Sequence, residues 1–105
     1  MMYMVAFNMR ASDAAARESL ENAIKKLGNW SNRMPGVWLV ESKAAAPQIR
    51  DFLKQHLGPA DGLFVARISK NWAGRNLGEG FPEWMGRRDF GTFGQAPSEG
   101  DSSGD

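Results

Sequence analysis

The chain has 105 residues, which is enough for one small domain with an apolar core and too few for two. Apolar residues make up 42% and charged residues 24%, so the composition is that of a globular protein and excludes disorder throughout. No apolar run approaches the roughly 20 residues of a membrane-spanning helix, and the absence of cysteine excludes disulfides and thiolate metal sites. We therefore expect a cytoplasmic protein with no membrane partner.

The charge is distributed unevenly along the chain. The net charge is +1, but no Lys or Arg follows Phe90, whereas three acids do: Glu99, Asp101 and Asp105. The part before them is therefore mildly basic. This balance is compatible with a polyanionic partner such as RNA, although the basic residues are not clustered densely enough to predict one from charge alone.

Residues 2–9 are predicted to form a strand that lies at the centre of a sheet, because both of its alternating sets of side chains are apolar. A helix is predicted to follow, with its N-cap at Ser12-Asp13 and its end at Gly28. The apolar positions of this helix recur at helical spacing: Ala16, Leu20, Ala23, Ile24 and Leu27.

A hairpin is predicted next, with strands at residues 30–34 and 37–40 joined by a turn at Pro35-Gly36. Pro47 suits the first turn of a second helix, which ends before Gly58-Pro59. Its buried stripe is predicted to contain Ile49, Phe52, Leu53 and Leu57. A fourth strand is expected at residues 63–68.

The predicted order is β-α-β-β-α-β over residues 1–70. With right-handed crossovers, this order gives an α+β, ferredoxin-like domain with a four-stranded antiparallel sheet and two helices on one face. The opposite face also carries large apolar side chains, so something must cover it. The candidates are a second copy of the chain, as a homodimer, and an aromatic-rich extension at residues 71–91. Residues 92–105 are predicted to form a disordered acidic Gly/Ser tail.

Four segments together resemble a group of small hypothetical proteins known as the SinR family. These segments are Tyr3–Met9, Leu27–Trp30, Val37–Ser42 and Asp61–Val65. The group is in turn similar to Cas2 and to VapD-type toxins, which are ferredoxin-like dimers. The resemblance spans about residues 2–70 and implies a dimer of this fold in a nucleic-acid context.

The resemblance also bears on activity. In Cas2-like metal-dependent nucleases the first strand ends in an aspartate, whereas Phe7-Asn8 stands at that place here. Without this carboxylate, a pair of chains would lose two negative ligands of a shared Mg²⁺ site. The departure points away from nuclease activity and towards the structural adaptors of this group.

One edge of the predicted sheet gathers polar residues into a candidate anion site. The end of the first strand, the start of the first helix and the hairpin meet there, and they bring Asn8, Arg10, Ser12 and Arg33 together with Asp61. Two guanidiniums beside a helix N-terminus could bind a phosphate. Capping combined with solvated surface charge explains the same residues equally simply.

The extension interleaves aromatic and basic side chains. Its candidate interface residues are Trp72, Arg75, Phe81, Trp84, Met85, Arg87 and Arg88. Such residues could cover the second face of the sheet or form a dimer contact, bind another protein, or bind single-stranded nucleic acid. The sequence leaves these three alternatives open.

No catalytic residue, metal ligand or cofactor is predicted. His56 is the single histidine and has no partner at a recognisable spacing, and Ser12, Ser19 and Ser31 lack the context of a nucleophile. The first hypothesis is therefore a non-catalytic, dimeric, Cas2-like adaptor that binds a protein or RNA. The alternatives are a metal-dependent endoribonuclease of the Cas2 or VapD type and a mobile-element inhibitor of a host defence complex.

Overall fold

The computed structural model describes residues 1–10 and 13–92. Its elements, in chain order, are β1 (Met2–Asn8), α1 (Ala14–Lys25), β2 (Trp30–Met34), β3 (Val37–Glu41), α2 (Ala46–Leu53), the 3-10 turn η1 (Lys54–His56), β4 (Gly62–Ile68) and α3 (Phe81–Gly86). The strands form an antiparallel sheet in the order β2-β3-β1-β4. This α+β architecture is compatible with a ferredoxin-like fold, and α3 is an addition to the expected order of elements.

The first strand lies at the centre of the sheet, as predicted, because β1 pairs with β3 on one side and with β4 on the other. Residues opposite each other in an antiparallel ladder project from the same face. Val5 lies opposite Trp38 and Val65, and these residues face the helices. The alternate residues of the three strands therefore form the second face.

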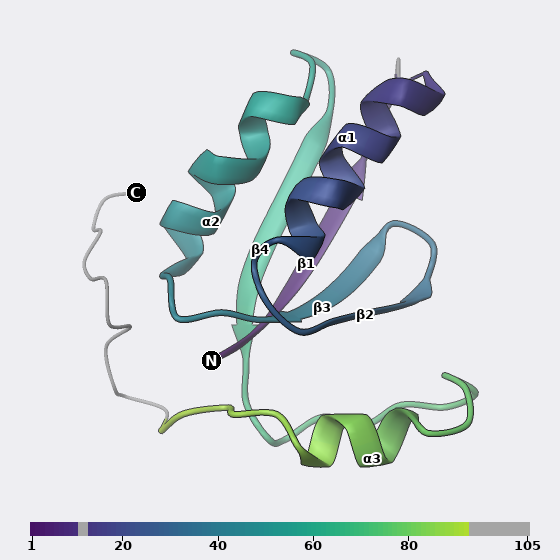
Figure 1. Ribbon diagram of the computed structural model, residues 1–105, viewed down its shortest axis with the longest axis vertical. Coiled ribbons are helices and arrows are strands. Elements are labelled where there is room, and N and C mark those ends of the chain that lie inside the picture. The colour runs from purple at the N-terminus through teal and green to yellow at the C-terminus, as the bar shows by residue number, and fades with distance from the viewer. Residues whose placement is uncertain (11–12, 93–105) are drawn as a thin grey trace.

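Both long helices pack on one face of the sheet, where they lie side by side in front of the strands in Figure 1. This core holds the buried residues Tyr3, Val5, Met9, Leu20, Ala23, Ile24, Trp38, Val40, Ile49 and Leu53. The apolar stripe predicted for the first helix is confirmed, because its central positions are buried and its two ends pack against the same core.

The first helix begins where the sequence predicts. Asp13 is its N-cap, and a carboxylate oxygen of Asp13 accepts a hydrogen bond from the backbone N–H of Ala16 at 2.8 Å. Ser12, the other predicted capping residue, lies outside the described residues. After the helix, Gly28 has a positive φ and packs so closely on the carbonyl group of Glu41 that a Cβ would clash.

The second helix is shorter than predicted. It ends at Leu53 and continues as one 3-10 turn, so Leu57 follows in an extended conformation, although it still packs against the core. The predicted burial of Phe52 is wrong, because its ring is 37% exposed and lies edge-on to His56. Helical spacing places Phe52 on the stripe, but the buried residues of α2 are Ile49 and Leu53.

Within the described part of the chain, every helix is too short and too polar to cross a bilayer.

Candidate functional site

The segment after β4 (residues 69–92) contains the predicted extension of residues 71–91, and from here on we call the whole segment the extension. It packs on the second face at one end of the sheet. Figure 1 shows α3 at the bottom of the view, near the end of β4 and the start of β1, whereas α1 and α2 lie above it. Phe81, Met85 and Phe90 of the extension form a second buried cluster with Met2 of β1. The extension thus provides an apolar cover for the sheet where β1 begins.

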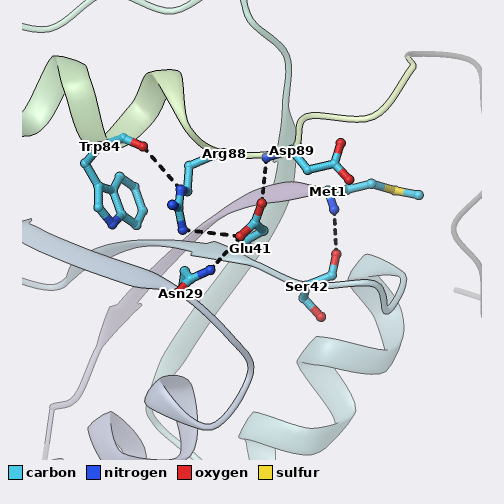
Figure 2. Close-up of polar contacts among 7 residues, drawn as sticks. All are labelled: Met1, Asn29, Glu41, Ser42, Trp84, Arg88 and Asp89. Atoms are coloured by element: carbon cyan, nitrogen blue, oxygen red, sulfur yellow. Dashed lines mark hydrogen bonds and ion pairs between the residues drawn. The ribbon is translucent and has the colours of Figure 1, made fainter.

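A charged contact, drawn in Figure 2, fixes the end of the extension to the sheet. Oε1 of Glu41 accepts hydrogen bonds from Nδ2 of Asn29 at 2.8 Å and from Nη1 of Arg88 at 3.3 Å. Oε2 of Glu41 accepts a third from the backbone N–H of Asp89 at 2.6 Å. The Arg88 and Glu41 side chains are only 11% and 20% exposed. We call these contacts the Glu41 clasp.

The environment of Glu41 favours its charged form. Burial acts to raise the pKa of the carboxyl group, but the hydrogen bonds from Asn29 and Asp89 and the charge of Arg88 outweigh burial. The pKa of Glu41 is therefore lower than its ordinary value of 4.5. The clasp is a structural ion pair at neutral pH, which explains why a glutamate ends a strand that is otherwise apolar.

The aromatic residues of the extension form a row. Trp72 and Phe81 meet edge to face with their ring centroids 5.6 Å apart, and Phe81 stacks with Trp84 at 6.3 Å. The guanidinium of Arg88 lies over the ring of Trp84 at 4.8 Å, as Figure 2 shows. Phe81 is buried and Trp84 half-buried, whereas Trp72 remains 36% exposed at the outer end of the row.

A cavity of about 370 Å³ opens beside Trp72, and every residue that lines it belongs to the extension. Its lining includes two aromatic and two charged residues: Trp72, Phe81, Arg75 and Glu79. The adjoining loop is tight, because Gly78 has a φ of 99° and packs against the guanidinium of Arg33 from β2. A Cβ at residue 78 would clash with that guanidinium unless the Arg33 side chain moved, and the left-handed φ also favours glycine there.

The rest of the second face is not covered within the described part of the chain. We call it the open half-face, and it consists of Met4, Ala6, Met34, Val37, Phe64 and Ala66. Phe64 is 59% exposed and Met34 is 46% exposed, and the other members are partly exposed. None of these side chains carries a charge, so the open half-face is an apolar surface formed by four adjacent strands.

The predicted anion site is brought together only in part. The backbone N–H of Arg10 donates to Oδ1 of Asp61 at 2.8 Å, so the end of β1 and the turn before β4 do meet. Asn8 is exposed opposite Gly62, and Ser12 lies outside the described residues. Arg33 points to the extension instead, against Gly78. At this edge the carboxylate of Asp61 therefore accepts hydrogen bonds from backbone N–H groups, whereas the guanidinium of Arg33 lies against the extension.

The interface candidates separate into buried and exposed residues. Phe81 and Met85 are buried inside the chain, and Trp84 and Arg88 are half-buried next to them. The exposed candidates are Trp72, Arg75 and Arg87. A partner at this surface would therefore meet the outer end of the aromatic row and not its centre.

The hydrogen bond between Ser19 and His56 is not predicted from the sequence. Oγ of Ser19 on α1 lies 2.7 Å from Nδ1 of His56 on η1, although the two residues are 37 positions apart. The bond is exposed, and the pair connects the middle of α1 with the end of η1. The pairing could not be found from sequence, because it depends on how α1 and η1 pack against each other.

Within residues 1–10 and 13–92, no cluster of three or more His, Cys, Asp or Glu side chains could hold a metal ion. The predicted tail, apart from Thr92, lies outside the described residues, and the carbonyl oxygen of Thr92 accepts a hydrogen bond from Nη2 of Arg67 at 3.2 Å.

No protein-family model, curated protein or solved structure matches the chain. The resemblance to the SinR family, Cas2 and VapD-type proteins therefore stays a prediction from sequence.

Proposed function

We propose that the chain is a non-catalytic interaction module with a ferredoxin-like fold, and that two copies associate through the open half-face. The observation that carries this proposal is the exposure of Phe64 and Met34, which lie on the two edge strands of an uncharged sheet surface. Contiguous apolar patches of this kind on a domain surface commonly mark an interface. The extension covers one end of the second face and leaves this part for a partner chain.

The chemistry of the open half-face favours a second copy as the partner. In a two-fold symmetric contact the same surface meets itself, so a charged residue in the patch would be brought close to its own copy. The open half-face has no charged side chain, and such a contact therefore carries no like-charge penalty. A nucleic acid would find no cation among these residues, which makes it the poorer occupant of this surface.

The resemblance to Cas2-like proteins is consistent with an adaptor. Relatives of that kind are ferredoxin-like dimers, and Asn8 stands where their nucleases carry an aspartate. Asn8 lies exposed at the end of β1, opposite Gly62. These features support an assembly role over a metal-dependent nuclease.

Phe64→Glu is expected to dissociate the dimer. The change places two carboxylates, one from each copy, near a contact that excludes water, and such like-charge juxtapositions cost several kcal/mol. We expect the dissociation constant to rise at least about 100-fold. Sedimentation velocity over a range of protein concentrations measures this change directly, and a circular dichroism spectrum checks that the variant is folded.

Phe52→Glu is the matched control, because Phe52 is also an exposed phenylalanine but lies on α2, away from the second face. It is expected to leave the association unchanged. The proposal would be wrong if the unmodified chain stayed monomeric, or if the two variants had the same effect.

A further inference from the structure

The cavity beside Trp72 combines an accessible aromatic ring with cations. Of the three rings in the aromatic row, Phe81 is buried and Trp84 is covered by the guanidinium of Arg88 at 4.8 Å. Trp72 is the exposed member, and it lines the cavity. A planar ligand that enters the cavity would therefore find an indole to stack on.

Two arginines lie at or next to this cavity. Arg75 lines the cavity, and Arg33 lies against Gly78, which lines it as well. Neither arginine forms an ion pair within the described part of the chain. The carboxylate of Glu79 also lines the cavity, so the three charges leave an excess of one positive charge. The site can thus attract an anion and also offers a hydrogen-bond acceptor.

From these observations we propose that the cavity binds single-stranded nucleic acid, with one base stacked on Trp72 and a neighbouring phosphate held by Arg33 and Arg75. A base has the flat π-face that an exposed indole recognises, and the backbone supplies the negative charge that the arginines require. Glu79 can accept a hydrogen bond from an exocyclic amino group of the base. The cavity volume of about 370 Å³ lies in the range of small-molecule sites.

This site is separate from the proposed dimer contact. The residues that line the cavity all lie in the extension, and none of them belongs to the open half-face. Arg33, the site residue on the sheet, precedes Met34 of that surface, but its guanidinium lies against Gly78 of the extension. The two proposals can therefore fail independently. A folded Phe64→Glu variant is expected to keep its affinity for nucleic acid per chain even when it no longer dimerises.

The test is fluorescence anisotropy with labelled single-stranded RNA of about 10 nucleotides, a length within the usual range of such sites, added to the full chain at low salt. Trp72→Ala is expected to weaken binding about 5- to 150-fold, because loss of one base–aromatic stack has that effect. Trp72→Phe should restore most of the affinity, since a phenyl ring also stacks. Arg75→Gln should weaken binding and reduce its dependence on salt.

Trp30→Ala is the matched control, because Trp30 is as exposed as Trp72 but packs against Trp38 on the face of the helices. It is expected to leave the affinity unchanged. Duplex RNA of the same sequence should compete poorly, since its bases are already stacked. The proposal is overturned if the labelled RNA shows no binding with the full chain at up to about 100 µM, a concentration that corresponds to typical non-specific affinity. Equal binding by Trp72→Ala, or equal competition by the duplex, would overturn it as well.

Discussion

Phe81→Ala is expected to lower the free energy of unfolding by about 3–5 kcal/mol, the usual cost of removing a buried phenylalanine ring. Phe81 is the first residue of α3 and lies in the buried cluster with Met2 and Met85. It also contacts the rings of Trp72 and Trp84 on either side. Its removal would therefore open a cavity between the extension and the sheet. Urea unfolding at equilibrium measures this loss.

Phe52→Ala is the control for this experiment, because its ring is 37% exposed and outside the core. Surface substitutions usually change stability by no more than about 0.5 kcal/mol, so a small effect is expected there. Equal losses from Phe81→Ala and Phe52→Ala would contradict the docking of the extension on the sheet. Hydrogen exchange at the amide of Asp89, which is bonded to Glu41, should also accelerate in Phe81→Ala alone.

Glu41→Gln is expected to lower the free energy of unfolding by about 2–4 kcal/mol at neutral pH, because it leaves the half-buried Arg88 without its charged partner. The effect should depend on pH with a definite sign. Since the pKa of Glu41 is lowered in the folded chain, its contribution is complete above the ordinary value of 4.5. That contribution is lost as the pH falls through the lower, folded pKa.

The measurement is urea unfolding of both proteins from about pH 7 to about pH 3, across the range in which carboxyl groups titrate. The difference between unmodified chain and Glu41→Gln should be largest at neutral pH and shrink in acid. Asp51→Asn is the control, because Asp51 also has a lowered pKa, from hydrogen bonds to Arg50 and Lys54, but is exposed. A Glu41→Gln effect that did not shrink in acid would contradict the clasp.

The sheet could be predicted from sequence because its strands carry signals that act locally. β3 and β4 are segments rich in β-branched and aromatic residues, and each follows a turn, at Pro35-Gly36 and at Asp61-Gly62. These signals predict both strands without information about other parts of the chain. The capping carboxylate of Asp13 is equally local. These elements depend on neighbours in the chain, so the sequence pattern is sufficient for them.

The errors concern residues whose position depends on distant parts of the chain. Phe52 fits the helical stripe, but Ile49 and Leu53 face the core, and the Phe52 side chain lies 37% exposed beside His56. Arg33 lies next to the hairpin turn, as expected. Its guanidinium packs against Gly78, which is 45 residues further along the chain. No local pattern could indicate that the loop before α3 returns to β2.

The Glu41 clasp also has only a weak signal in the sequence. Glu41 ends a strand of apolar residues and alternates with Val40, so its side chain is placed on the second face opposite Met2. A charge at such a position requires a partner or solvent. The partner, Arg88, comes from the extension, and its identity becomes apparent only when α3 is in place.

We expect the open half-face to meet a second copy of the chain in solution. Hydroxyl-radical footprinting of the unmodified chain at high and low protein concentration tests it most directly, because it reports side-chain accessibility residue by residue. Met34 and Phe64 are expected to be protected at high concentration and to become reactive on dilution, while Trp72 stays reactive throughout. Equal reactivity of Met34 and Phe64 at both concentrations would contradict the account.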